Sequence, residues 1–252
     1  MKLTLLGTAN ASQVPVYNCA CPACARARHD PRFRRGPCSA LIECGGQRWL
    51  IDSGLTDLAE RFPPGSIKGV LQTHYHADHV QGLLHWRWGK GTRLPVLGPD
   101  DPEGFADLYK HPGMLDFSQK LTAFQLRKFE GFSVTPLPLY HSKPTFGYLF
   151  SDGISSVAYL TDTVGLPPDT QARLQEQPLD LLVLDCSYGP LPEAPRNHND
   201  LTRALETIAS LNVRKAVLTH IGHEFDCWLM EHQNELPENV VVGFDGTVLM
   251  CS

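Results

Sequence analysis

The chain has 252 residues, enough to bury a full hydrophobic core without cross-links, and its 42% hydrophobic and 19% charged residues are typical of a globular protein. Its net charge of −5 argues against general nucleic-acid binding, which depends mainly on neutralising phosphates. No run approaches the roughly 20 apolar residues that cross a bilayer, and the N-terminal apolar run is too short for a signal peptide. We therefore expect a single cytoplasmic domain over residues 1–252 that binds neither membranes nor extended nucleic acid.

Strand patterns dominate both halves of the chain. The first half predicts a strand at 1–7, a hairpin of strands at 40–44 and 47–52 around Gly45-Gly46, strands at 67–73 and 94–98, and a helix over 100–111. The second half predicts a hairpin of strands at 145–150 and 155–161, a doubly covered strand at 179–185, an amphipathic helix over 199–211 with Asn199 as its N-cap, and a strand at 213–219. Strand-rich blocks followed by helices, twice over, predict an α/β protein in which two sheets pack face to face with helices outside.

One short segment carries most of the candidate chemistry. Residues 74–79 read His-Tyr-His-Ala-Asp-His and follow the strand predicted at 67–73. Imidazole nitrogen and carboxylate oxygen suit zinc, manganese or iron. His74 and His76 alternate in extended chain and can point the same way, whereas Asp78 and His79 would turn toward a second ion as a helix begins. A histidine-rich surface loop is the alternative interpretation.

Three further candidates each end an apolar, strand-like run, which is where α/β proteins gather functional side chains. They are His141, Asp162 and His220. Each alone is compatible with a hydrogen-bonded residue that caps a strand. Together with residues 74–79 they predict a metal centre.

The pattern His-x-His-x-Asp-His after a strand resembles the signature of the metallo-β-lactamase superfamily. Leu50-Ile51-Asp52-Ser53-Gly54 is similar to the motif whose aspartate supports the family's metal site from behind. The resemblance implies an αββα sandwich of two facing mixed β-sheets with helices on the outer faces. It also implies two metal ions, one bound by His74, His76 and His141, the other by Asp78, His79 and His220, with Asp162 bridging them.

Such a pair of ions can hold a bridging hydroxide at neutral pH and stabilise the charge on a phosphoryl oxygen during attack. His198 and Asp78 are the catalytic candidates. Resemblance to phosphodiesterase members of the superfamily implies that His198 donates a proton to the leaving group or contacts the phosphate, and a solvent-exposed cap is the alternative. Residues 141–148 are similar to the transfer-RNA 3′-processing branch, but no Gly/Pro-rich basic arm is found, so we expect a small phosphodiester substrate.

Three cysteines on a tight loop, Cys19, Cys21 and Cys24, supply three quarters of a tetrahedral structural zinc site in a Cys-rich region near residues 18–38. His223 is the best fourth ligand, with His29, Cys38 and Cys227 as alternatives, and redox-active thiols are the competing interpretation. A cytoplasmic location favours thiols or metal ligands over disulfides. The scattered cysteines are expected to be small buried hydrophobes: Cys38, Cys44, Cys186, Cys227 and Cys251.

The cysteine trio combined with the complete His/Asp set resembles the PhnP family, the phosphoribosyl cyclic phosphodiesterases of the carbon–phosphorus lyase pathway. This resemblance implies two catalytic ions, with Mn²⁺ favoured and Zn²⁺ as the other choice, one structural Zn²⁺ and a homodimer. It implies hydrolysis of phosphoribosyl 1,2-cyclic phosphate or a 2′,3′-cyclic nucleotide during phosphonate utilisation. A pyrroloquinoline-quinone biosynthesis protein of the same superfamily carries a similar cysteine loop.

Five arginines crowd residues 26–35, namely Arg26, Arg28, Arg32, Arg34 and Arg35. One or two of them are candidates for binding a second phosphate of the substrate through forked hydrogen bonds, and a solvated surface is the expected role of the others. Three other functions stay open: a transfer-RNA 3′-processing endonuclease, a non-catalytic metal-binding protein of a biosynthetic pathway, and a lactonase or thioesterase.

Overall fold

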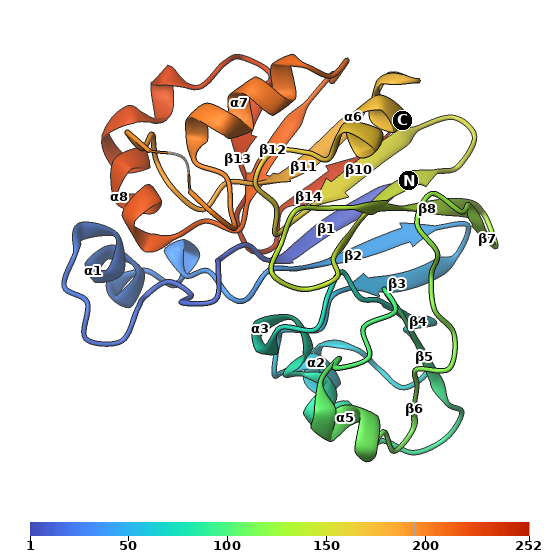
Figure 1. Ribbon diagram of the computed structural model, residues 1–252. Helices are drawn as coiled ribbons and strands as arrows, with labels where there is room; N and C mark the ends of the chain where they lie inside the picture. Colours follow the sequence, from blue (N-terminus) through green and yellow to red (C-terminus); the bar gives the residue numbers. More distant parts are fainter. Residues whose placement is uncertain (194, 252) are drawn as a thin grey trace.

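The computed structural model describes residues 1–193 and 195–251 as two facing seven-stranded sheets with helices on both outer sides (Figure 1). The strands are β1 Lys2–Gly7, β2 Ser39–Cys44, β3 Gln47–Ile51, β4 Gly69–Leu71, β5 Leu94–Leu97, β6 Leu115–Asp116, β7 Arg127–Phe129, β8 Phe132–Pro138, β9 Phe146–Ser151, β10 Ser156–Leu160, β11 Leu181–Asp185, β12 Ala216–Thr219, β13 Val240–Val242 and β14 Val248–Met250. The helices are α1 Pro22–His29, α2 Leu58–Arg61, α3 Ala77–Val80, α4 Leu83–Trp86, α5 Ala106–Lys110, α6 Pro168–Gln175, α7 Leu201–Ala209 and α8 His223–His232, with 3₁₀ turns at Pro31–Phe33 and Gln233–Glu235.

The strand order explains how the chain forms its two layers. The first sheet runs β14-β1-β2-β3-β4-β5-β6, and the second runs β13-β12-β11-β10-β9-β8-β7. Both sheets are mixed, because β1 and β2 pair antiparallel whereas β3, β4 and β5 pair parallel, and β10, β11, β12 and β13 pair parallel beside an antiparallel β9. The predicted αββα sandwich is confirmed. Among the described residues, no helix combines the length and apolar character needed to span a bilayer.

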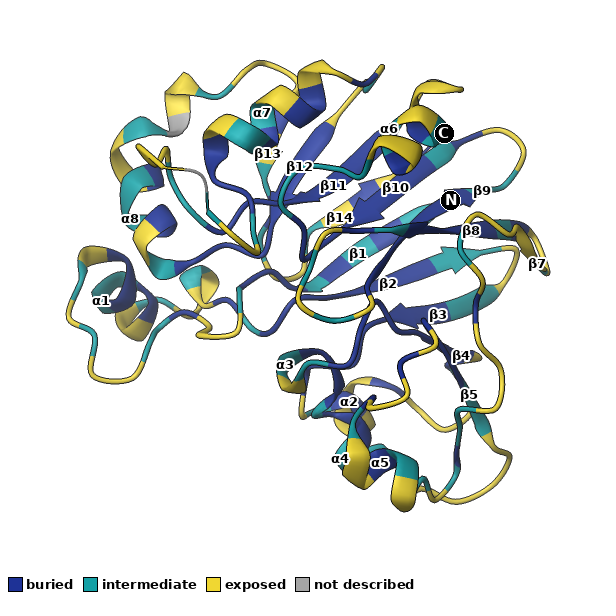
Figure 2. Cartoon of the chain, in the orientation of Figure 1, coloured by how far each residue is buried: buried dark blue, intermediate teal, exposed yellow. Residues whose placement is uncertain are grey.

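The central strands of the second sheet are continuously apolar because both of their faces are covered. In β11, Leu181 and Val183 point into the core between the sheets. Leu182 and Leu184 point the other way, into a cluster with residues of α6, α7 and α8. A strand between two apolar layers needs apolar residues at every position, which is the pattern seen in the sequence, and these strands are dark blue in Figure 2.

The first sheet is built by the same alternation. Trp49 and Ile51 of β3 enter the core between the sheets, whereas Leu50 packs in an outer cluster with residues of α2, α4 and α5. Strand β14 reaches this sheet from the far end of the chain and pairs Met250 with Lys2 of β1. The N-terminal ammonium also donates a hydrogen bond to the Cys251 carbonyl at 3.1 Å.

Two local predictions are wrong. The helix predicted over 100–111 is only α5, because Pro102 and Gly104 interrupt residues 100–105, and Gly104 adopts a φ of 44°. The N-cap of α7 is Asp200, which accepts a hydrogen bond from the Arg203 amide at 3.0 Å. Asn199 instead accepts from the Gly165 amide at 2.7 Å, so its side chain joins two loops and does not cap the helix.

We expect Leu182→Ala to lower the free energy of unfolding by about 2–5 kcal/mol, because Leu182 is fully buried and its removal leaves a cavity. Chemical denaturation monitored by circular dichroism measures the change. Leu126 is 50% exposed, so Leu126→Ala is the control and should change stability by no more than about 0.5 kcal/mol. Equal effects of the two substitutions would contradict the assignment of the core.

Candidate dinuclear metal centre

The candidate metal-binding residues meet at the carboxyl ends of strands from both sheets. Asp52 follows β3, Asp162 follows β10 and His220 follows β12. All three have left-handed backbones, with φ values of 61°, 60° and 61°. Residues other than glycine adopt this conformation at a cost, and such strain concentrates where surrounding structure fixes a functional side chain.

Three imidazoles form the first half of the cluster. The Nδ1 atom of His76 lies 2.9 Å from Nε2 of His74 and 3.1 Å from Nε2 of His141. His141 follows β8, 65 residues after His76, so the fold supplies this contact. Tetrahedral zinc would hold nitrogen ligands about 3.3 Å apart, so the three nitrogens are spaced for one ion.

The second half contains Asp78, His79 and His220, whose donor atoms lie within 4.8 Å of one another. Asp162 stands between the halves. Its Oδ1 atom is 3.3 Å from Nε2 of His220 and 3.7 Å from Nε2 of His141, and its Oδ2 atom is 3.3 Å from Nε2 of His79. The structure therefore brings together all seven candidate residues predicted from the sequence, in the two groups that the family resemblance implies.

Two nitrogens in this cluster are buried without a hydrogen-bond partner in the described part of the chain. They are the Nε2 atoms of His79 and His220. Buried polar atoms are almost always satisfied, and an unpaired one costs about 1–3 kcal/mol. Both atoms point at Asp162, so a divalent cation in this position would satisfy them, and the donor set fits two such ions.

The charge distribution supports cation binding. Burial holds the pKa of His74 well below its ordinary value, so this imidazole is a neutral donor. Burial opposes charge on Asp162, but the imidazoles of His220 and His79 hold the pKa of this carboxylate well below its usual range. Burial also opposes charge on His79, yet Asp162 and Asp52 raise its pKa well above the ordinary value. A bound cation would take the place of that proton.

The second nitrogen of every imidazole in the set has a partner that orients the ring. Such outer contacts fix the tautomer and raise the basicity of the ligand. The pairs are His74 Nδ1 with Thr73 Oγ1 at 3.0 Å, His76 Nε2 with Ser142 Oγ at 3.4 Å, His79 Nδ1 with Asp52 Oδ2 at 2.8 Å, His141 Nδ1 with the Asn197 carbonyl at 3.3 Å, and His220 Nδ1 with Ser187 Oγ at 2.8 Å.

Asp52 is the centre of this outer layer. It is fully buried and accepts hydrogen bonds from the Thr73 amide at 2.8 Å, the Thr73 hydroxyl, the Gln72 side chain at 2.8 Å and His79 Nδ1. These bonds tie the end of β3 to the turn that carries His74 and His79. Asp52 thus lies behind the cluster, where the family motif places its aspartate.

His198 lies beside the cluster but is paired with a residue that the sequence analysis missed. Its Nδ1 atom is 2.8 Å from Oδ2 of Asp185, and its ring stacks on His220 with centroids 4.6 Å apart. Burial opposes a proton on His198, but the charge and hydrogen bond of Asp185 raise its pKa to about 9. Asp185 is the last residue of the apolar strand β11. Its position at a strand end, which identified Asp162 as a candidate, could also have identified Asp185.

A separate cluster joins the N-terminal loop to α8. The Sγ atoms of Cys19 and Cys21 each lie 3.5 Å from Nδ1 of His223, and Cys24 completes a group of four within 4.8 Å. Zinc with tetrahedral bonds of about 2.3 Å to sulfur and 2.0–2.1 Å to nitrogen would give the same sulfur–nitrogen separation of about 3.5 Å. The four residues therefore fit a structural zinc, with His223 as the fourth donor.

The alternative donors differ in position. Cys38 is buried elsewhere, against Tyr159, Thr161 and Thr219. Cys227 lies next to the four residues, where the Ala23 amide donates to its sulfur at 3.5 Å. Cys186 and Cys251 are buried as expected, whereas Cys44 and Cys227 are partly exposed, so the expectation of burial is wrong for these two.

The arginine-rich segment is mainly structural. Arg35 is buried and makes two hydrogen bonds to Asp226 on α8, at 3.2 and 3.1 Å, so a solvated role is wrong for this residue. Arg28 donates to the carbonyls of Cys19 and Val16 and so braces the cysteine loop. The other three arginines also have partners within the chain: Arg26 with Asp226, Arg32 with Asp30, and Arg34 with the Ala27 carbonyl.

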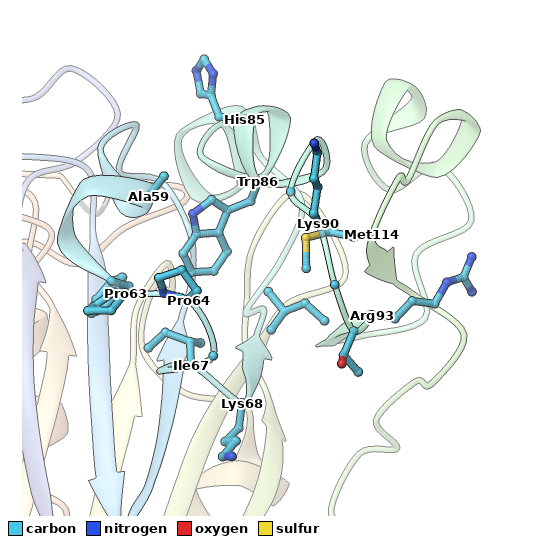
Figure 3. A pocket seen from close by; sticks show the side chains of 16 residues that line it. Ala59, Pro63, Pro64, Ile67, Lys68, His85, Trp86, Lys90, Arg93 and Met114 are labelled. Atoms are coloured by element: carbon cyan, nitrogen blue, oxygen red, sulfur yellow. The ribbon is translucent and has the colours of Figure 1, made fainter.

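A cavity of about 700 Å³ lies away from these residues, on the outer side of the first sheet (Figure 3). Phe62, Ile67, Trp86 and Met114 form apolar walls, and Lys68, Lys90 and Arg93 are its charged lining residues. None of the seven cluster residues lines this cavity, so it is separate from the candidate metal centre.

Comparison with known proteins agrees with this geometry. Residues 47–221 match the beta-lactamase superfamily domain. The chain belongs to the metallo-β-lactamase superfamily. A solved diphosphatase of the PhnP family is 26% identical, covers 100% of this chain and 98% of its own, and superposes with a TM-score of 0.82. The PhnP resemblance inferred from the cysteine and histidine motifs is thereby confirmed.

Two other similar proteins have names that indicate functions different from that of the diphosphatase. Zn²⁺-bound PqqB from Methylobacterium extorquens has a TM-score of 0.80 at 20% identity, with 99% of this chain and 100% of the other covered, which shows a shared fold. A protein of Porphyromonas gingivalis named octanoyltransferase is 27% identical over 98% of this chain but 51% of its own length. The chain thus spans about half of that relative, and the name describes the longer protein.

We expect Asp52→Ala to weaken metal binding at the His79 side about 10- to 100-fold, because His79 would lose the partner that orients it. Titration of metal-free protein against a competing chelator measures the affinity. Asp169→Ala, which removes an exposed carboxylate on α6, is the matched control and should leave the metal affinity unchanged. An unchanged affinity in Asp52→Ala would contradict the supporting role of this carboxylate.

Proposed function

We propose that the protein is a metal-dependent phosphodiesterase that hydrolyses a small cyclic phosphate, of the phosphoribosyl 1,2-cyclic or 2′,3′-cyclic nucleotide type, in phosphonate utilisation. The observation that carries this proposal is the position of His198, a proton-bearing imidazole held by Asp185 directly beside a cluster suited to two cations. Hydrolysis of a phosphodiester needs an activated water on one side of phosphorus and a proton donor for the leaving oxygen on the other.

We assign His74, His76 and His141 to one ion, Asp78, His79 and His220 to the other, and Asp162 to both. When bound, two divalent cations would supply an activated water and offset the negative charge on the phosphoryl oxygens. The donor set suits Mn²⁺, which the PhnP resemblance favours, and Zn²⁺. Cys19, Cys21, Cys24 and His223 are assigned to one structural zinc.

The chain's own residues account for orientation and proton transfer. Asp185 holds Nδ1 of His198, which leaves Nε2 as the nitrogen that faces the substrate. As water adds to phosphorus and the phosphorus–oxygen ester bond breaks, the Nε2 proton passes to the departing alcohol oxygen. Burial opposes ionisation of Asp78, but His79 lowers the pKa of this carboxyl, so Asp78 is anionic and serves as a ligand while the substrate binds beside it.

A diphosphate is the second candidate substrate, because the PhnP-family relative that aligns over the whole chain is named a diphosphatase. The same cluster and the same proton donor would act on a phosphoanhydride. A screen of cyclic phosphodiesters against nucleoside diphosphate derivatives separates the two candidates. Cleavage of precursor transfer RNA would instead favour the nuclease, and inertness of the metal-loaded protein toward phosphodiesters and esters would favour a non-catalytic metal-binding protein.

Asp162→Ala is expected to reduce metal-dependent phosphodiesterase activity by at least about 10³-fold, because both cations would lose a shared anionic ligand worth several kcal/mol. Activity is measured on a generic cyclic phosphodiester with metal supplied. Asp169→Ala, which removes an exposed carboxylate on α6, is the control. Near-normal turnover of Asp162→Ala with its fold intact would refute the proposed site.

His198→Ala should retain its metal content yet lose about 10²–10⁴-fold in kcat, the range for removal of a general acid. Because Asp185 raises the pKa of His198 to about 9, the protonated form dominates at neutral pH and is lost as pH rises through that pKa. Asp185→Asn lowers the pKa and should move the alkaline limb of the kcat profile to lower pH. An alkaline limb unmoved by Asp185→Asn, or normal turnover of His198→Ala, would exclude this acid.

A further inference from the structure

A fifth cysteine stands beside the proposed structural zinc site. Cys227 lies on α8 one helical turn after His223, so both side chains project from the same face of the helix. The Ala23 amide donates to Cys227 Sγ at 3.5 Å, and the next amide, of Cys24, donates to Cys21 Sγ at 3.4 Å. Adjacent amides at the start of α1 thus hold two sulfurs that come from distant parts of the chain.

The two sulfurs are neighbours and can both be reached from solvent. The Cys21 and Cys227 sulfurs accept hydrogen bonds from consecutive backbone amides, and both residues are partly exposed, as is Cys19. Cys24 is fully buried. Helices α1 and α8 pack directly against each other, so the distance between their backbones is set by the fold. A small oxidant can therefore reach Cys21, Cys227 and Cys19, but not Cys24.

Cys227 also differs from its neighbours in its bonding. Within the described chain, the group of four with zinc-ligand spacing is Cys19, Cys21, Cys24 and His223, which leaves Cys227 outside. A thiol that is not committed to the metal can attack an oxidised neighbour, whereas the other sulfurs of the site are held as ligands. This position is that of a resolving cysteine in thiol oxidation.

We infer that Cys21 and Cys227 form a redox modification site, in which peroxide converts the pair to a disulfide and the structural zinc is released. The inference rests on the structural zinc assigned under the proposed function. It gives a specific role to a cysteine that the phosphodiesterase reaction does not use.

The chemistry balances with hydrogen peroxide as the oxidant. The Cys21 sulfur attacks one peroxide oxygen, the oxygen–oxygen bond breaks, and protonation of the departing oxygen gives water and a Cys21 sulfenic acid. The Cys227 sulfur then attacks the Cys21 sulfur, a sulfur–sulfur bond forms, and the sulfenic oxygen leaves as water with the Cys227 proton. Two thiols lose two electrons and two protons, and one peroxide becomes two waters. Zinc then retains three of its four donors.

The site is linked to the candidate catalytic centre through the start of α8. His220 precedes His223 by three residues, and the Gly222 amide donates at 3.1 Å to the carbonyl of Ser187, whose hydroxyl orients His220. The buried Arg35–Asp226 pair holds the next turn of α8. Oxidation should therefore disturb the first turn of α8 and reduce turnover without unfolding the protein.

The test uses zinc-loaded full-length protein, treated with hydrogen peroxide in the presence of a chromogenic zinc chelator. We expect release of about one zinc per chain, together with a Cys21–Cys227 cross-linked peptide in non-reducing peptide mapping, and reversal by dithiothreitol plus zinc. Cys227→Ser should hold its zinc before treatment and release it at least about tenfold more slowly. Cys44→Ser, which alters a partly exposed cysteine on β2, is the matched control and should behave as the parent protein.

A cross-link from Cys21 to Cys19 or Cys24, with Cys227→Ser releasing zinc at the parent rate, would overturn the inference. If Cys227→Ser does not fold, Cys227→Ala provides the same comparison. Untreated protein that carries no zinc beyond the catalytic pair, with Cys21→Ser unchanged in metal content and melting temperature, would overturn both the structural zinc and the redox site. Phosphodiesterase activity of the untreated protein is measured in parallel, so failure of the catalytic proposal is seen separately.

Discussion

The burial of Asp162 among imidazoles is the interaction on which the rest of the site depends. This carboxylate is 2% exposed and faces nitrogens from five histidines that come from four parts of the chain. An isolated charge would be costly in such a place, and buried charges persist only when they are paired or bound to a cation. Two of the facing nitrogens have no hydrogen-bond partner in the described residues, and the divalent cations that we propose would satisfy both of them.

The sandwich fold stabilises the protein through its apolar layers, so that the polar site can be placed at the ends of the strands. Strands β3, β10 and β12 end at one edge, and their apolar residues fill the layers on both sides of each sheet. The polar residues then follow the last apolar one, as Asp52, Asp162, Asp185 and His220 do. Rigid strands fix their positions, and hydrogen bonds from Thr73, Gln72 and Ser187 fix their orientation. His198, which we propose as the proton donor, lies beside the cluster and is held there by Asp185.

Sequence patterns identified the parts of the site that are local or end a strand. The segment 74–79 and the strand-end residues His141, Asp162 and His220 could be predicted, because alternation and strand ends are visible in a short window. Contacts between residues far apart in the chain could not be predicted in this way. The partnership of Asp185 with His198, the burial of Arg35 against Asp226 and the addition of β14 beside β1 all join residues that only the folded chain brings together. The N-cap of α7 was also predicted wrongly. Asn199 and Asp200 are both suitable cap residues, and Asp200 caps the helix because the Asn199 side chain binds the Gly165 amide instead.

The central claim is that seven side chains hold two cations with Asp162 between them. Anomalous diffraction from crystals of protein purified without chelator, collected at the manganese and zinc absorption edges, tests it most directly. We predict one anomalous peak enclosed by His74, His76 and His141, and a second beside Asp78, His79 and His220, with Asp162 in contact with both. The absence of any peak in this cluster, or a single ion remote from Asp162, would contradict it.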